Sequence, residues 1–219
     1  RRERFQREAT VLQTATRSGV FPELISYEAT ASEGILRMKK IAGETVMERI
    51  ARGYRFTDNE VLSMLDRVLT GLHVDLHPRG YVHRDLSPNN ILVNGHNDSL
   101  EVRVVDFGSV GVDATGTISG TVAAGTLGYC PREQWEGNAV PASDMYALGA
   151  TAYSMLTGEI LKTPYDRFNF DKIRDRSVRK LIKKMTAPLE AGLFQTKRYQ
   201  TAREALVDVR KMLGQVGNG

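Results

Sequence analysis

The stretch His83–Val93 constrains this chain more than any other, because it joins a turn-forming segment to a short apolar strand. Asp85 and Asn90 stand five positions apart within it, and a second apolar run, Val102–Val105, leads directly into Asp106. An acid that accepts a hydroxyl proton, an amide oxygen and a second acid form the layout of Mg²⁺-assisted phosphoryl transfer. The oxygens of Asn90 and Asp106 suit Mg²⁺, which takes one or two protein ligands together with substrate phosphates.

The order His-Arg-Asp-Leu-Ser-Pro-Asn-Asn at 83–90, then Asp-Phe-Gly at 106–108, resembles the catalytic and metal-binding loops of protein kinases. Either motif alone is weak evidence, but the pair, in this order and spacing and with its strands, is strong. The resemblance covers nearly the whole chain and implies an α+β, protein-kinase-like fold. It implies a remnant of the β-rich small lobe at 1–42, a mostly helical large lobe at 43–213 and a tail at 214–219.

The resemblance gives each motif residue a role. Asp85 would orient the attacking hydroxyl and accept its proton, while Asn90 and Asp106 would hold Mg²⁺ on the phosphates of ATP. Its structural residues are His83, Phe107, Gly108, Glu133, Asp144 and Arg198. Of these, His83 and Phe107 would stack with Leu12, and Glu133 would pair with Arg198 in the interior. Asp144 would brace the catalytic-loop backbone, cap its own helix, or do both.

The first forty residues are similar to the end of a kinase small lobe. Helical spacing predicts a helix over 1–14, and Glu8 stands where that family places the glutamate that pairs with a lysine; an ordinary surface glutamate is the alternative. Strands are expected at Glu23–Tyr27 and Gly34–Met38. Adenine would contact residues at or after the second strand and one in the later apolar strand. These expected nucleotide-binding residues are Met38, Lys39, Ile41 and Leu92, with Met38 as the gatekeeper.

The sequence lacks the two lysines whose side chains contact the ATP phosphates in this family. There is no Gly-x-Gly-x-x-Gly and no Val-Ala-Ile-Lys pattern, so the chain resembles a kinase domain that begins at the helix carrying Glu8. Ser87 occupies the position where Ser/Thr kinases usually carry a lysine. A serine hydroxyl can donate a hydrogen bond but supplies no charge, so we expect weaker stabilisation of the transition state.

Helix signals recur through the second half of the chain. Thr57-Asp58-Asn59-Glu60 predicts the start of a long buried helix that reaches Leu76. His73 and His77 lie one turn apart there, but no third zinc ligand is evident, so packing at the helix end is favoured. Ser143-Asp144 predicts the start of an apolar helix that ends at Thr157-Gly158. Apolar residues from Val178 to Met185 predict another amphipathic helix.

Between these helices lies a nearly uncharged segment, Ser109–Ala124, which resembles a kinase activation loop. Its candidate phosphorylation sites are Thr115, Thr117, Ser119 and Thr121. Arg84 would be the charge partner of such a phosphate. A loop that is never phosphorylated is the open alternative. Thr126, in the segment that follows, implies Ser and Thr rather than Tyr as the accepting residue.

Composition limits the remaining classes. The chain has 219 residues, 41% of them hydrophobic and 26% charged, and it has no apolar run near the length of a membrane span. One cysteine excludes an internal disulfide framework and fits a reducing, cytoplasmic location, as a free protein or as the cytoplasmic domain of a larger one. The net charge of +4 is dispersed, which favours a solvated surface over nucleic-acid binding.

These observations favour a Ser/Thr protein kinase domain that uses ATP and Mg²⁺ and acts on Ser or Thr of a protein substrate. The first alternative is a pseudokinase that serves as a docking or regulatory module, which the missing cations support. The second is a small-molecule phosphotransferase of related fold. His83-Arg84, the segment Gly125–Tyr129 and the expected Glu133–Arg198 pair argue against that second alternative.

Overall fold

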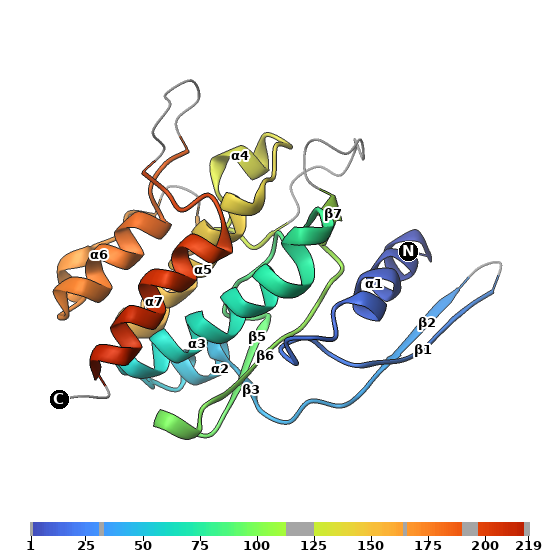
Figure 1. Ribbon diagram of the computed structural model, residues 1–219, viewed down its shortest axis with the longest axis horizontal. Helices are drawn as coiled ribbons and strands as arrows, with labels where there is room; N and C mark the ends of the chain where they lie inside the picture. The colour runs from blue at the N-terminus through green and yellow to red at the C-terminus, as the bar shows by residue number, and fades with distance from the viewer. Residues whose placement is uncertain (1, 31–32, 113–124, 164–165, 190–196, 217–219) are drawn as a thin grey trace.

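The structure is a computed structural model that describes residues 2–30, 33–112, 125–163, 166–189 and 197–216. A small part, made of one helix and a two-stranded hairpin, lies beside a larger helical part (Figure 1). Helices with a few antiparallel strands confirm the predicted α+β class. The domain boundaries at 42 and 213 stay predictions.

The elements follow the chain in a simple order. The small part consists of α1 (Arg2–Thr14), β1 (Leu24–Ala29) and β2 (Gly34–Met38). The helices of the larger part are α2 (Val46–Ala51), α3 (Asp58–Gly71), α4 (Arg132–Trp135), α5 (Pro141–Thr157), α6 (Arg176–Met185) and α7 (Ala202–Val216). Its strands are β3 (Glu44–Thr45), β4 (Tyr81–Val82), β5 (Ile91–Asn94), β6 (Glu101–Val104) and β7 (Gly111–Val112). They form the sheets β1–β2, β3–β5–β6 and β4–β7, all antiparallel.

The loop after α1 fastens the small part to the helical part. The buried carboxylate of Asp75 accepts hydrogen bonds from the backbone amides of Arg17 and Ser18, at 3.1 and 2.9 Å. A few residues later, the Phe21 ring meets the Phe107 ring edge-on, with centroids 5.2 Å apart. A buried carboxylate needs such donors, because burial without them would be costly. The loop is therefore seated on the helical part by a polar and an aromatic contact.

Helix α3 forms where the sequence predicts it and then changes its winding. Thr57 and Glu60 form a capping box, in which each side chain accepts a hydrogen bond from the other's backbone amide. The α-helix ends at Gly71, and Leu72–Leu76 continues as a π-helical turn. The predicted single helix to Leu76 is thus right in position and wrong in its last turn. Such single π-helical turns are rare and commonly lie at functional sites.

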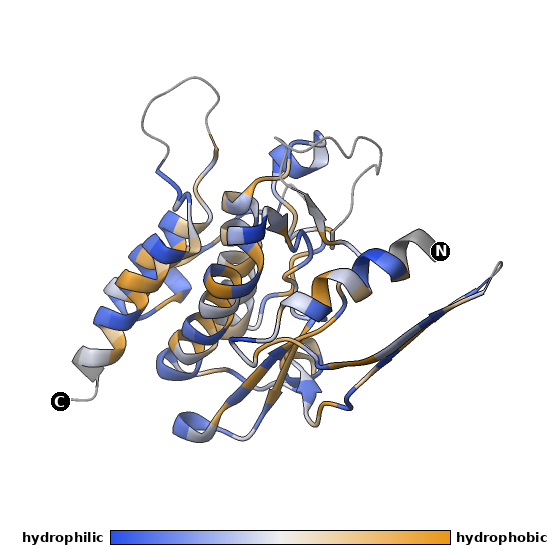
Figure 2. Ribbon diagram, turned by 45° about the vertical axis from the view of Figure 1, so that its right-hand side comes forward, coloured by the Kyte–Doolittle hydropathy of each residue, from blue (hydrophilic) through white to orange (hydrophobic). Residues whose placement is uncertain are grey.

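Helix α5 is the buried centre of the helical part. It lies beside α3, α6 and α7, and each of these helices carries its apolar residues on one side and its polar residues on the other (Figure 2). Apart from Tyr146 and the last turn, every residue from Ala142 onward is buried, as the sequence predicts. Its predicted start at Ser143-Asp144 is wrong. The helix begins at Pro141, where proline's fixed φ suits the first helical position, so Asp144 is not the N-cap.

The hairpin β5–β6 presents two different faces. Ile91 and Val93 on β5, with Val102 and Val104 on β6, are buried in the core. Leu92 lies opposite Arg103 on the other, partly exposed face. Alternation along both strands therefore separates a core face from a face that is open to a ligand. No helix within the described residues is long and apolar enough to cross a membrane.

A buried ion pair joins α4 to the segment before α7. Arg198 is 3% exposed, and its Nη1 lies 2.5 Å from Oε1 of Glu133, which also accepts a hydrogen bond from Ser143 Oγ at 3.0 Å. Arg198 Nε donates to the carbonyl of Ala187 at 2.6 Å. The guanidinium also lies over the ring of Tyr146, 5.0 Å from its centroid. The buried guanidinium is therefore engaged by a carboxylate, a carbonyl and a ring that are themselves largely shielded from water.

Removing one partner of this pair should destabilise the fold strongly. We expect Glu133→Ala to lower the free energy of unfolding by about 3–5 kcal/mol, because it leaves the guanidinium buried without its counter-ion. Urea denaturation followed by circular dichroism measures the loss. Arg132→Ala is the matched control, since its neighbouring ion pair with Glu136 is exposed to solvent, which screens it, and its loss should leave the stability nearly unchanged. Equal losses in the two variants would contradict a structural role for the buried pair.

Candidate active site

The catalytic loop predicted at 83–90 runs between β4 and β5, and other elements hold its backbone. The carboxylate of Asp144 accepts hydrogen bonds from the amides of His83 and Arg84, both at 2.9 Å. Gln134 Nε2 donates to the carbonyl of Arg84 at 2.6 Å, and Thr151 Oγ1 donates to that of Leu86 at 2.8 Å. Three side chains from α4 and α5 thus fix the residues on both sides of Asp85.

The site stores backbone strain at two of its residues. Arg84 and Asp106 adopt φ values of 69° and 59°, which residues with a side chain rarely take up. Each such residue costs on the order of 1–3 kcal/mol, and the surrounding hydrogen bonds must hold it in place. The Oδ1 of Asp106 accepts the amide of Gly108 at 2.9 Å. This arrangement turns the chain at the end of β6 and fixes the direction of the Asp106 side chain.

Asp85, Asn90 and Asp106 converge because the loop and the β5–β6 hairpin are joined by hydrogen bonds. Asn90 Nδ2 donates to the carbonyl of Asp85 at 2.9 Å, which fixes the amide group. The amide of Val105 donates to the carbonyl of Asn90 at 2.9 Å, so Asp106 follows directly beside it. Carboxylate and amide oxygens fit Mg²⁺, which needs few protein ligands when phosphates supply the others. No cluster of three His, Cys, Asp or Glu side chains suited to a metal occurs in the described residues.

One oxygen of Asp85 is already engaged by the segment that follows the predicted activation loop. Thr126 donates to Oδ1 of Asp85 twice, from its amide at 3.0 Å and from its hydroxyl at 2.7 Å. The Thr126 hydroxyl also lies 3.1 Å from Oγ of Ser87. Sequence analysis placed Thr126 near the substrate but gave no contact with Asp85. The structure therefore brings Ser87 and Thr126, both singled out from the sequence, together at the carboxylate of Asp85.

His83 is a packing residue in a column of aromatic and apolar side chains. It has no exposed surface, and its ring lies 5.1 Å from that of Phe107, edge to face. Leu12 of α1 belongs to the same core and is also fully buried. Burial lowers the pKa of His83 below the usual 6.5, although the nearby carboxylates, Asp144 foremost, oppose the shift. The imidazole is therefore held neutral.

Two further carboxylates hold this column in place. The Oε1 of Glu8 lies 3.4 Å from the amide of Phe107, which links α1 to the loop after β6. Asp144 is completely buried, which opposes its ionisation. The hydrogen bond to His77 Nε2, at 3.0 Å, and the amides of the catalytic loop nevertheless hold the pKa of Asp144 below its ordinary value. His77, which the sequence assigned to packing at the helix end, thus makes a polar contact with Asp144.

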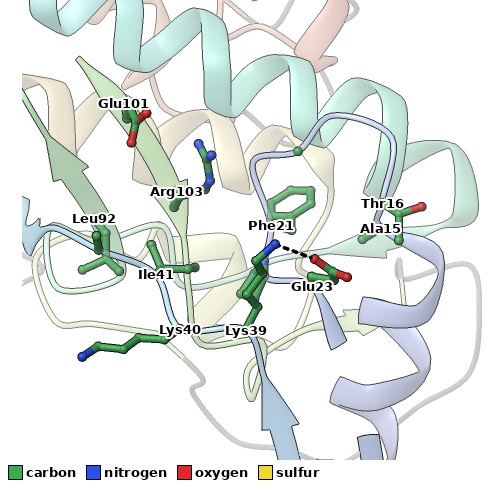
Figure 3. Close-up of a pocket in the computed structure, with 13 residues that line it drawn as sticks. Ala15, Thr16, Phe21, Glu23, Lys39, Lys40, Ile41, Leu92, Glu101 and Arg103 are labelled. Carbon is green, nitrogen blue, oxygen red and sulfur yellow. Dashed lines mark hydrogen bonds and ion pairs between the residues drawn. The ribbon is translucent and has the colours of Figure 1, made fainter. Parts of the chain in front are cut away.

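A pocket of about 470 Å³ lies beside the open face of β5–β6 (Figure 3). Three of the four residues expected to bind the nucleotide line it, namely Lys39, Ile41 and Leu92. Met38, the predicted gatekeeper, does not line it, because it pairs with Leu24 across the hairpin and is 38% exposed.

The pocket and the three catalytic candidates are separate but adjacent. Asp85, Asn90 and Asp106 are not among its lining residues. Leu92 and Arg103 do line it, and they stand two and three positions along β5 and β6 from Asn90 and Asp106. One strand pair therefore connects a pocket of mixed apolar and charged lining at one end with oxygen ligands at the other.

Arg84 presents its guanidinium beside the predicted activation loop. A Cβ atom at position 111 would lie 1.2 Å from Arg84 Nη2, so the guanidinium lies directly against the backbone of Gly111 and would have to move for any larger residue there. The pKa of Arg84 is lowered by burial and, next, by the charge of Arg7 on α1. Its Nε is buried without a hydrogen-bond partner among the described residues. The candidate phosphorylation sites Thr115, Thr117, Ser119 and Thr121 lie outside the described residues.

Comparison with known proteins decides the family. Residues 1–213 match the family model of the protein kinase domain. The chain belongs to the protein kinase family. Serine/threonine-protein kinase PknA of Nostoc is 32% identical over 164 residues, which cover 72% of this chain and 28% of that protein. Serine/threonine-protein kinase C of Synechocystis is 34% identical over 170 residues, covering 74% and 31%.

A third relative extends the comparison to another bacterial group. Serine/threonine-protein kinase PknL of Mycobacterium tuberculosis is 36% identical over 152 residues, which cover 65% of this chain and 37% of that protein. This chain thus spans about a third of the length of these curated kinases. The family membership confirms the resemblance drawn from the two loop motifs.

Sequence reasoning missed the residues that hold the kinase loop from outside. Gln134 and Thr151 carry no motif, and their roles depend on hydrogen bonds to carbonyls 50 and 65 positions away. The Ser87–Thr126 contact spans 39 positions and was equally invisible. Of these residues, only Ser87 stood out in the sequence, because it replaces the lysine of the family pattern.

The burial of His83 predicts a pH dependence of stability. An unfolded chain binds a proton at this histidine below about pH 6.5, whereas the folded protein, with its lowered pKa, does not. The free energy of unfolding should therefore fall as the pH drops from 7.5 to 5.5, by up to about 1.4 kcal/mol per pH unit. Urea titrations at several pH values measure this slope.

His83→Phe should flatten that slope, because phenylalanine keeps the contact with Phe107 and takes up no proton. His73→Gln serves as the control, since His73 is exposed on the π-helical turn. A slope that is unchanged in His83→Phe, or lost only in His73→Gln, would contradict the burial of a neutral imidazole.

Proposed function

We propose that this chain is the catalytic part of a Ser/Thr protein kinase, which transfers the γ-phosphate of ATP to a protein hydroxyl. The observation that carries the proposal is the convergence of Asp85, Asn90 and Asp106 on loops held by α5 and by the β5–β6 hairpin. Family membership and the names of the curated relatives support the same activity.

Asp85 has the role of base in the proposed reaction. Its Oδ1 is occupied by the two donors of Thr126, so Oδ2 is the oxygen that would accept the proton of the substrate hydroxyl. Asn90 and Asp106 would hold Mg²⁺, which when bound neutralises charge on the phosphates. Because the loop backbone is fixed on both sides, Asp85 needs no rearrangement to meet its substrate.

The adenine would occupy the pocket beside Ile41 and Leu92, with its phosphates directed along β5–β6 toward Asn90 and Asp106. Lys39 lies at this pocket and forms an exposed pair with Glu23 at 3.3 Å. Met38 keeps its proposed place at the end of the hairpin, outside the pocket lining. Glu8 remains the carboxylate proposed to pair with a lysine of a nucleotide-covering strand, from its present place beside Phe107.

Phosphorylation near the active site is the proposed means of control. Arg84 and Arg7 place two positive charges beside the end of the segment that holds Thr115, Thr117, Ser119 and Thr121. A phosphate on one of these residues would pair with these two cations and offset their charge. Of the two arginines, the partly buried Arg84 would gain more hydrogen bonding from the phosphate, because its Nε lacks a partner among the described residues.

A pseudokinase is the second candidate function, and Ser87 is the observation that favours it. Ser87 supplies no charge at the position where the family places a lysine. A protein that only binds partners would have no need of a base, yet the loop around Asp85 is held by side chains from two helices. The two candidates differ in one measurable property, which is transfer of phosphate.

Asp85→Asn in the full-length protein that contains this chain should abolish phosphoryl transfer to Ser and Thr residues. We expect a loss of at least about a thousandfold, because the amide cannot accept the hydroxyl proton. Intact-mass spectrometry after incubation with MgATP measures the phosphate incorporated. Asp171→Asn is the matched control, since that side chain is 89% exposed and lies on the surface.

The outcomes separate the two candidates. Transfer that persists in Asp171→Asn and vanishes in Asp85→Asn supports a kinase with Asp85 as its base. Equal transfer in the wild type and in Asp85→Asn would refute that role. Absence of transfer in the wild-type full-length protein would favour the pseudokinase.

A further inference from the structure

Ser87 makes a polar contact, although it lacks the charge of the lysine that the family pattern has at this position. Its side chain has no exposed surface, and its Oγ lies 3.1 Å from Oγ1 of Thr126. The same Thr126 oxygen lies 2.7 Å from Oδ1 of Asp85. Three oxygens therefore form a short chain, from Ser87 through Thr126 to the carboxylate of the proposed base.

The positions of the protons in this chain follow from the groups themselves. A carboxylate only accepts, so Thr126 must spend its single hydroxyl proton on Asp85, with which it makes the shorter, charge-assisted bond. The lone pairs of the Thr126 oxygen then remain for Ser87, which donates its own proton to them. Ser87 thereby selects the one rotation of the Thr126 hydroxyl that directs its proton at Asp85.

Backbone hydrogen bonds hold both hydroxyl residues of this hydrogen-bonded series, Ser87 and Thr126, in place. The carbonyl of Ser87 accepts the amide of Asn90 at 3.0 Å, and the carbonyl of Thr126 accepts the amide of Tyr129 at 3.0 Å. The Thr126 amide is itself bonded to Asp85. The backbone hydrogen bonds thus fix the position of the short Ser87 side chain, and its hydroxyl contacts the Thr126 hydroxyl directly.

We propose that Ser87 is a positioning residue, which acts through Thr126 to fix the carboxylate of Asp85 for proton transfer. The inference rests on the proposed function, since it takes Asp85 as the base. With Oδ1 held by two donors, Oδ2 is left in one orientation toward the incoming hydroxyl. This neutral clamp occupies the place where the family pattern has a lysine, so Ser87 is a built part of this site and not merely a missing charge.

A double-mutant cycle on the full-length protein tests the proposal, with Ser87→Ala, Thr126→Val and both changes together. Steady-state phosphorylation gives kcat and the KM for ATP for each variant. We expect Ser87→Ala to lower kcat about fivefold with an unchanged KM, which is the size of one neutral hydrogen bond. In the Thr126→Val background, Ser87→Ala should have no further effect, because the residue through which it acts is gone.

Several results would overturn the proposal. They are an unchanged kcat in Ser87→Ala, equal effects of Ser87→Ala with and without Thr126, or a kcat in Ser87→Lys above that of the wild type. The last result would mean that Ser87 is a simple deficit of charge.

Two controls separate this proposal from its premises. Thermal unfolding of each variant excludes a loss of fold, and Ser87→Cys, which is close in size and a weaker donor, should give an intermediate kcat if Ser87→Ala is unstable. Asp85→Asn is measured in parallel. If it retains activity, the proposed function fails. If it is inactive while the cycle is additive, only the role of Ser87 fails.

Discussion

The carboxylate of Asp144 is the interaction on which the rest of the site depends. It is completely buried in α5, and it remains ionised there because His77 and two amides of the catalytic loop donate to it. A buried charge of this kind is tolerated only with such partners. The helix that forms the centre of the core therefore also fixes the loop that carries Asp85, so that packing and chemistry share one support.

The strained residues become understandable in this context. Arg84 and Asp106 adopt unfavourable φ values at the two places where the chain must turn side chains toward one centre. The hydrogen bonds of Asp144 and Gln134 hold the first, and the bond from Gly108 holds the second. Strain of this size persists only when the surroundings determine the conformation. In the proposed reaction, a geometry fixed in this way would lower the cost of reaching the transition state.

Much of the fold and part of the site could be predicted from the sequence, because certain residues carry their role in their type and spacing. The loop motifs, the apolar helix α5 and the Glu133–Arg198 pair belong to this class. The π-helical turn after Gly71 and the start of α5 at Pro141 depend on tertiary packing, which a local pattern does not contain. The contacts of Gln134, Thr151 and Ser87 join distant positions through ordinary residues, so no motif announces them.

The most direct test of the account is whether nucleotide binding depends on Mg²⁺ through Asp106. Isothermal titration of the full-length protein with a non-hydrolysable ATP analogue, with and without Mg²⁺, measures this dependence. The account predicts that Mg²⁺ tightens binding at least about tenfold in the wild type, and that Asp106→Asn removes most of that gain. Binding that is equally tight with and without Mg²⁺, or a gain that persists in Asp106→Asn, would contradict the assignment of this loop as the metal-binding site.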